Sequence, residues 1–195
     1  MDKSTVIKNN LKESIRLKEL ILSDETMINA IKLSADTIIK TYQNNGKVMF
    51  CGNGGSAADA QHLSAELSGR YNFDRPSLNA EALHVNTSYI TAVANDYSFE
   101  EIYSRLIKAF GNNGDVLIGL STSGNSKNVI NALIEAQKLG CTTIGLTGEG
   151  GGNMKVHCDI LIPIPSIDTP RIQECHMIIG HSICEIVEEA LFERP

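Results

Sequence analysis

The sequence predicts an α/β fold in which five parallel strands form one sheet that is covered by helices on both faces. From residue 47 onward, short segments rich in Val, Ile and Leu alternate with longer segments of helical periodicity. The short segments are apolar throughout, which is typical of parallel strands buried on both faces. Repeated β-α-β units with right-handed crossovers then give a three-layer α/β/α sandwich.

The composition is that of one globular domain spanning residues 1–195. Apolar residues make up 42% of the chain and charged residues 21%, and the formal net charge is −6. An acidic balance argues against nucleic-acid binding, which needs a basic face. No apolar run approaches the ~20 residues of a membrane span. The charged N-terminus lacks a signal-peptide core, so we expect no membrane association and a cytoplasmic location.

Two helices are expected before the first strand, over residues 2–22 and 25–44. Ser23-Asp24 interrupts the first helix, and Asn44-Asn45-Gly46 ends the second. Residues 1–46 are therefore predicted to form a helical hairpin ahead of an α/β core at 47–195. The hairpin either packs against a neighbouring subunit or covers its own sheet.

The α/β core begins at residue 47. Strands are expected at 47–51, 80–85, 115–120, 142–147 and 159–163. Helices are expected at 56–70, 87–94, 98–109, 126–139 and 170–192, with a short turn near 152–156. In such sheets, ligands bind at the carboxyl ends of the strands.

The first glycine-rich turn, Cys51-Gly-Asn-Gly-Gly-Ser56, joins a strand to a helix and offers backbone N–H groups to an anion. It lacks the dinucleotide and P-loop patterns, so no nucleotide cofactor is expected. Its alternative role is tight backbone geometry alone. The following helix carries His62 and Glu66 on one face, which indicates an acid/base pair or metal ligands. Cys51 is either a nucleophile or, as we favour, a packed thiol.

The second turn, Ser121-Thr-Ser-Gly-Asn-Ser126, places four hydroxyl groups between a strand end and a helix start. Hydroxyls, backbone N–H groups and the helix dipole together favour a phosphate group. The alternative is N-capping by Ser126 within a polar turn. Further along, Gln173, His176 and His181 interrupt an otherwise apolar helix. A lone buried histidine is usually structural, but this combination indicates a site.

These motifs resemble those of the sugar isomerase (SIS) domain family. The segments CGNGGS, DAQHLSAEL, STSGNS and TPRIQECH occur in the family's order, and the resemblance is greatest to its phosphoheptose isomerases. It covers essentially the whole chain. It implies a flavodoxin-like sandwich, a homotetramer with active sites at subunit interfaces, and conversion of sedoheptulose 7-phosphate to D-glycero-D-manno-heptose 7-phosphate. The product would enter lipopolysaccharide or capsule synthesis.

The resemblance also implies roles for individual residues. Glu66 and His181 match the catalytic positions, and one zinc ion per subunit is implied at His62, Glu66, Gln173 and His181. The implied substrate contacts are Asn53, Gly54, Gly55, Ser56, Glu66, Arg70, Asn95, Asp96, Ser121, Thr122, Ser123, Ser126 and Gln173.

The chemistry of aldose–ketose isomerisation agrees with these residue types. A carboxylate can move the carbon-bound proton, and an imidazole can move the proton between oxygens. A cation or hydrogen-bond donors must stabilise the enediolate. Gln173 and His181 lie eight positions apart, a rise of about 12 Å along one straight helix. Either the helix start is bent, or different subunits assemble the metal site, and we favour the second explanation.

Two alternative functions stay open at this point. Some SIS-domain relatives bind a replication-initiator protein without catalysis, and that branch loses the acid/base pair which this chain retains. Another sugar phosphate, a hexose or pentose phosphate, is the second alternative, because fold alone does not define the substrate.

Overall fold

The computed structural model describes residues 1–194 and confirms the five-stranded parallel sheet. The strand order is β2-β1-β3-β4-β5, and every neighbouring pair is parallel. The strands are β1 (Val48–Gly52), β2 (Ala80–Ala82), β3 (Val116–Ser121), β4 (Thr142–Thr147) and β5 (Ile160–Pro163). Only β2 is clearly shorter than expected. Leu83 still donates its N–H to Phe50, but the chain then turns toward Asn86, the N-cap of the next helix.

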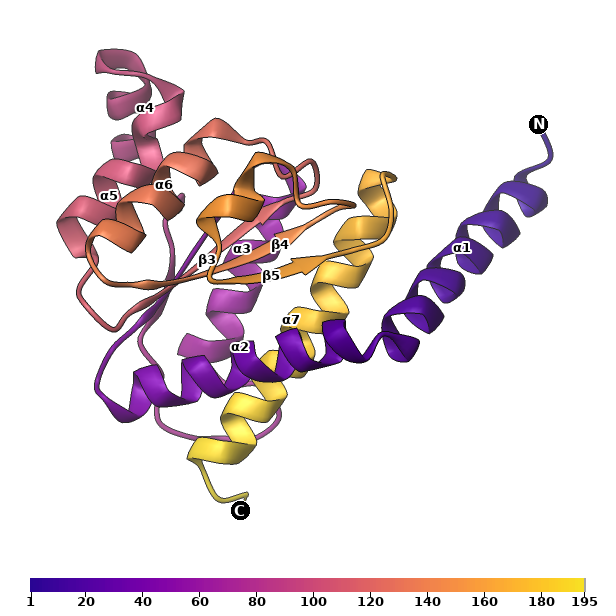
Figure 1. Cartoon of the computed structure of the whole chain (residues 1–195), viewed down its shortest axis with the longest axis horizontal. Helices are drawn as coiled ribbons and strands as arrows, with labels where there is room; N and C mark the ends of the chain where they lie inside the picture. Colours follow the sequence, from indigo (N-terminus) through magenta and orange to yellow (C-terminus); the bar gives the residue numbers. More distant parts are fainter. Residues whose placement is uncertain (195) are drawn as a thin grey trace.

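Helices cover both faces of the sheet (Figure 1). One face packs against α2 (Glu25–Gln43), α3 (Gly55–Ser68) and α7 (Thr169–Leu191). The other face packs against α4 (Thr87–Asp96), α5 (Ile102–Phe110), α6 (Lys127–Lys138) and the 3-10 segments η1 (Phe99–Glu101) and η2 (Gly152–His157). Each face has its own apolar core, so the predicted three-layer sandwich is confirmed.

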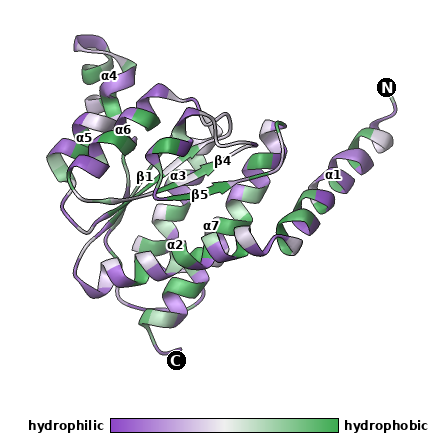
Figure 2. Cartoon of the chain, in the orientation of Figure 1, coloured by the Kyte–Doolittle hydropathy of each residue, from purple (hydrophilic) through white to green (hydrophobic). Residues whose placement is uncertain are grey.

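The two N-terminal helices do not form the expected hairpin. Asp24 is extended and caps α2 by accepting hydrogen bonds from Thr26 and Met27. This one-residue link sets α1 (Lys3–Ser23) at an angle to α2, so that its N-terminus points away from the body of the molecule (Figure 1). The end of α1 packs on α7, whereas α2 packs on both the sheet and α7. Leu17 and Ile21 are the buried residues of α1, while Ile7, Leu11 and Ile15 are exposed. Figure 2 shows that apolar residues recur along the whole helix. The N-terminal helices were expected either to cover their own sheet or to pack against a neighbouring subunit. Of the two helices, α2 alone covers the sheet.

The sheet brings the two polar turns together. β1 and β3 are hydrogen-bonded neighbours, and Gly52 lies opposite Leu120 at their carboxyl ends. The glycine-rich turn after β1 and the hydroxyl-rich turn after β3 therefore lie side by side, as expected for the ligand edge of a parallel sheet. Through residue 194, the chain contains no helix with the length and apolarity needed to cross a membrane.

Candidate active site

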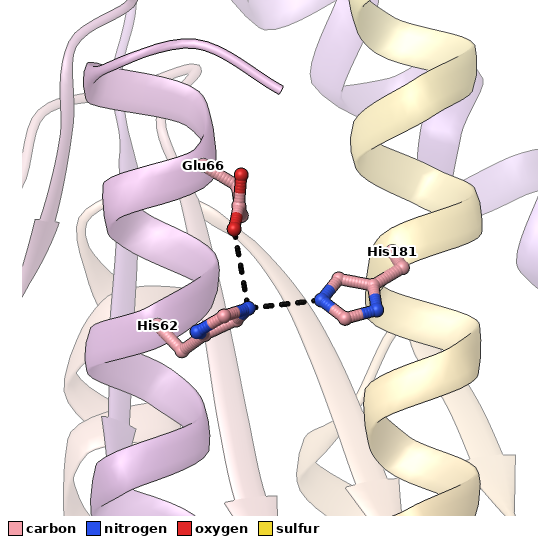
Figure 3. Close-up of side chains that lie close together, drawn as sticks. All are labelled: His62, Glu66 and His181. Carbon is pink, nitrogen blue, oxygen red and sulfur yellow. Dashed lines mark hydrogen bonds and ion pairs between the residues drawn. The ribbon is translucent and has the colours of Figure 1, made fainter. Parts of the chain in front are cut away.

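Three reactive side chains of a single chain meet between α3 and α7. His62 Nε2 lies 3.2 Å from Glu66 Oε1 and 2.9 Å from His181 Nε2 (Figure 3). His62 and Glu66 project from successive turns of α3, and His181 faces them from α7. His62 is exposed, while Glu66 and His181 are half-buried. We refer to His62, Glu66 and His181 as the triad.

A close contact between the two helices brings the triad together. Gly180, the residue before His181, packs on Leu63, the residue after His62. A Cβ atom at Gly180 would lie 2.6 Å from the Leu63 methyl carbons, inside their contact distance. The absence of a side chain at Gly180 thus permits the helix approach that places His181 against His62.

The triad fits a zinc ion. One ligand atom from each of His62, Glu66 and His181 can be chosen so that all three lie within 4.8 Å of one another. Two imidazoles and one carboxylate are a ligand set of catalytic zinc sites, which keep a further position open for water or substrate. The residues present are therefore compatible with the ion that the resemblance implies.

Of the four residues implied as metal ligands, the structure brings three together within one chain and leaves out Gln173. His181 meets His62 and Glu66 within one chain. Gln173 is the exception, because its amide lies beside Gly55 at the start of α3, where a Cβ would come within 2.3 Å of Nε2. Gly55 and His62 are separated by roughly 10 Å along the helix axis. Gln173 thus borders the glycine-rich turn rather than the triad.

The hydroxyl-rich turn has the geometry of an anion site. Ser121 Oγ lies 2.9 Å from Ser126 Oγ and 3.5 Å from Ser123 Oγ, so three hydroxyls converge at the end of β3. Ser126 occupies the N-cap position of α6, yet its side chain makes no capping hydrogen bond. The capping alternative therefore does not account for Ser126, whose hydroxyl is directed to Ser121.

A glycine-rich loop supports this turn from behind. Gly151 and Gly152 have φ values of 80° and 53°, and Gly152 packs directly on the Ser123–Gly124 backbone. Met154 donates its N–H to the Gly124 carbonyl at 2.9 Å. A cavity of about 270 Å³ lies next to the turn. Its lining residues are Thr122, Ser123, Glu149, Ser166, Ile167 and Thr169.

A larger cavity of about 740 Å³ lies elsewhere, between β2, α4 and α5. It contains none of the triad and none of the serines of the β3–α6 turn. The candidate site therefore rests on the chemistry of the triad and of the hydroxyl-rich turn, and not on the size of a cavity.

The glycine-rich turn is tied to the hydroxyl-rich turn through two amides. Asn53 and Asn128 exchange two hydrogen bonds, each of 2.8 Å, which link the end of β1 to the first turn of α6. The Asn53 side chain therefore joins the two turns. Gly54 and Gly55 are exposed at the start of α3, and Ser56 is buried behind them.

Three further predicted contacts lie outside this cluster. Arg70 is exposed just beyond the end of α3. Asn95 donates a hydrogen bond of 2.9 Å to Asp96 at the exposed end of α4. α4 packs on the opposite face of the sheet from α3 and α7. The structure thus does not bring Asn95 and Asp96 of the same chain to the triad.

Two residues considered from the sequence have structural roles. His176 is fully buried and its Nε2 lies 3.1 Å from the Thr147 carbonyl oxygen. Burial lowers the pKa of His176 to about 4, so the ring is a neutral core side chain. Cys51 is also fully buried, and burial raises the pKa of its thiol well above the ordinary value. The packing interpretation of Cys51 therefore holds.

Sequence reasoning overlooked Asp59 and Tyr71. Asp59 lies three residues before His62, and its Oδ2 atom is buried without a hydrogen-bond partner. Burial raises the pKa of Asp59, and nearby His62 opposes this rise. The Tyr71 ring centroid lies 5.8 Å from that of His181. The i, i+3 spacing of Asp59 and His62 was a readable signal, whereas nothing local connects Tyr71 with His181.

Comparisons with known proteins identify the family and agree with the fold. The SIS domain model matches residues 13–148. A phosphoheptose isomerase of Sulfurimonas denitrificans is 48% identical over 95% of each chain. One of Aneurinibacillus thermoaerophilus is 50% identical over 95% of this chain and 94% of the relative. The solved phosphoheptose isomerase of Francisella tularensis superposes with a TM-score of 0.93, at 35% identity, over 97% of this chain and 100% of that one.

The family match covers well over half of the chain, and the relatives are similar along their full lengths. The solved relative shares the fold of this chain, in which two helical layers cover a sheet of five parallel strands. The chain belongs to the SIS domain family and, within it, to the phosphoheptose isomerases.

Proposed function

We propose that the protein interconverts sedoheptulose 7-phosphate and D-glycero-D-manno-heptose 7-phosphate. The observation that carries this proposal is the triad of His62, Glu66 and His181, which lies in a phosphoheptose isomerase framework. A turn with convergent hydroxyls at the carboxyl end of β3 supports it. The triad supplies acid/base groups, and the turn suits the phosphate that both sugars carry.

The reaction moves one proton between adjacent carbons and another between their oxygens. Glu66 is the carbon base, since a half-buried carboxylate can take the proton from one carbon and return it to the next. His181 transfers the oxygen proton, as an imidazole can do near neutral pH. Ser121, Ser123 and Ser126 hold the phosphate group, which fixes the reacting carbons relative to Glu66.

Zinc at the triad is part of the proposal. When bound, the ion would supply positive charge that stabilises the negative oxygens of the enediolate. His62, Glu66 and His181 would hold it. Gln173 lies away from these residues within its own chain. We therefore assign Gln173 to the sugar beside Gly55 or to the site of a neighbouring subunit.

A homotetramer with active sites at subunit interfaces is also proposed. Two features support assembly: apolar side chains are exposed along α1, and Asn95 and Asp96 lie on the opposite face of the sheet from the triad. A neighbouring subunit could supply both residues to a site that lacks them. A cytoplasmic location and a role in heptose precursor synthesis for lipopolysaccharide or capsule belong to the same proposal.

The alternatives have less support. A binding protein without catalysis does not need Glu66 and His181, yet both are present and in contact with His62. Isomerisation of a shorter sugar phosphate uses the same chemistry. The seven-carbon substrate is favoured because relatives near 50% identity over nearly the whole chain are phosphoheptose isomerases.

The deciding experiment is an isomerase assay with purified protein and sedoheptulose 7-phosphate. We expect formation of the heptose 7-phosphate, loss of activity with a chelator, and recovery with added Zn²⁺. Fructose 6-phosphate and ribulose 5-phosphate serve as competing substrates. Equal or faster turnover of either competing substrate would reject the seven-carbon assignment. If none of the three sugar phosphates is converted, the proposed isomerase activity is rejected.

A further inference from the structure

A buried ion pair lies behind the triad and belongs to none of the roles assigned above. Glu188, two turns beyond His181 on α7, has 0% of its side chain exposed, and Arg75 has 1% exposed. Arg75 Nε donates to Glu188 Oε1 at 2.9 Å. Removing two charges from water is costly, and a buried pair is often no more stabilising than apolar residues of similar size. Its position therefore calls for an explanation beyond stability.

Glu188 organises the segment that follows α3. Its Oε1 atom also accepts the Tyr71 N–H at 2.8 Å, and its Oε2 atom accepts the Asn72 N–H at 2.6 Å. Burial raises the pKa of Glu188, but the hydrogen bonds from Asn72, Tyr71 and Arg75 outweigh it and hold this pKa below its ordinary value. The carboxylate thus fixes Tyr71, whose ring approaches His181, and the chain next to Arg70.

Arg75 binds the end of α3 itself. Its Nη2 atom donates to the backbone carbonyl of Glu66 at 2.9 Å, and Nη1 donates to Leu67 at 2.8 Å and Gly69 at 3.2 Å. These are carbonyls that the end of a helix leaves without partners. One guanidinium therefore connects the backbone of the proposed base, Glu66, to the carboxylate of Glu188 on α7.

We propose that Arg75 and Glu188 are positioning residues that set the separation of α3 and α7 at the triad, in support of the function proposed above. The Leu63–Gly180 contact fixes the two helices at one level. The Arg75–Glu188 pair fixes them further along, beyond Glu66 and His181. The two helices are thus held at the level of the triad and again beyond it, which fixes the distance across which its three side chains meet.

A second buried ion pair of the chain offers a matched control. Asp115 is also a buried carboxylate, and its partners are the Lys47 ammonium at 2.6 Å and the backbone N–H groups of Lys47 and Asn112 at 3.0 and 2.8 Å. Both residues directly precede strands, and none of these hydrogen bonds involves α3 or α7. Asp115→Asn therefore removes a similar charge network without touching α3 or α7.

The test is Zn²⁺ titration of metal-free, full-length protein in the absence of sugar, with the melting temperature measured in parallel. We expect Glu188→Gln to raise the Kd for Zn²⁺ at least ~10-fold, the size of effect seen when a supporting shell is lost. Arg75→Lys keeps the positive charge but loses the forked donor, so it should lose part of the Zn²⁺ affinity and retain more than Glu188→Gln does. The Kd of Asp115→Asn for Zn²⁺ should stay within about twofold of the wild-type Kd, even if the melting temperature of this variant falls.

A single substitution can leave one buried charge unpaired and prevent folding. The double variant Arg75→Met with Glu188→Met avoids this, since apolar replacement of a buried pair is often tolerated. It should weaken Zn²⁺ binding as Glu188→Gln does. Wild-type affinity in these variants, an equal loss in Asp115→Asn, or no Zn²⁺ binding by any protein would overturn the proposal. Because the titration contains no sugar, failure of the isomerase assay would reject the proposed function separately.

Discussion

His62 Nε2 and His181 Nε2 lie 2.9 Å apart although the two residues are 119 positions apart in the chain. An N–H of one ring can donate to the other ring at this distance, and the tautomers decide which ring is the donor. Glu66 Oε1 lies 3.2 Å from the same His62 nitrogen. The three side chains thus face one point, where an ion held by them would also stabilise an enediolate oxygen.

Replacement of His62 should separate metal binding from acid/base chemistry. His62→Ala removes one of three ligands and leaves Glu66 and His181 in place. We expect Zn²⁺ affinity to fall by at least about tenfold, as measured by calorimetric titration of metal-free protein. His157→Ala, a substitution in η2 outside the triad, is the control. Unchanged affinity in His62→Ala would remove this residue from the metal site.

Replacement of Glu66 by its neutral isostere tests the base. Glu66→Gln keeps the size of the side chain but removes the proton acceptor, so kcat should fall by about 10²–10⁴-fold. The melting temperature and the KM for the sugar phosphate should change little, because the phosphate-binding serines lie on another element. Glu19→Gln on α1 serves as a carboxylate control. A variant with wild-type kcat would show that another group moves the carbon-bound proton.

The fold was predictable because its signals are local. Mostly apolar segments located every strand, and the i, i+4 spacing identified His62 and Glu66 as a pair. The direction of α1 was not predictable, because it depends on a single extended residue, Asp24, and on which surface covers the apolar side chains.

The missing parts of the site depend on tertiary contacts. His181 reaches His62 through the packing of Gly180 on Leu63, and a glycine within an apolar helix gives no sign of its partner. In the sequence, Glu188 and Arg75 look like surface charges. Their burial could not be predicted, because Glu188 accepts hydrogen bonds from the backbone of Tyr71 and Asn72, and Arg75 donates to the Leu67 carbonyl, all contacts of the folded chain. Gln173 was grouped with the triad by resemblance, whereas its position on α7 places it at the other end of α3.

The hydroxyl-rich turn should govern substrate affinity more than turnover. Ser126→Ala removes one of three convergent hydroxyls and no helix-capping bond, so the KM for the sugar phosphate should rise about three- to tenfold, the equivalent of one lost hydrogen bond. The kcat value should stay close to that of the wild type. Steady-state kinetics with Ser14→Ala of α1 as control would test this. A fall in kcat alone would contradict the phosphate assignment.

Acid should destabilise the protein partly through His176. Burial lowers the pKa of this ring from its ordinary value of 6.5 to about 4, although the hydrogen bond to the Thr147 carbonyl opposes the shift. Between these values the unfolded chain binds the proton more readily, so stability is complete above about pH 6.5 and is lost as the pH falls toward 4. Linkage gives a loss of about 2 kcal/mol in the free energy of unfolding between pH 7 and pH 5. His176→Gln, which can still donate to Thr147 but does not titrate, should lack this part of the loss in urea denaturation at the two pH values. The same pH-dependent loss in both proteins would show that His176 does not contribute, because a group absent from the variant cannot produce its titration.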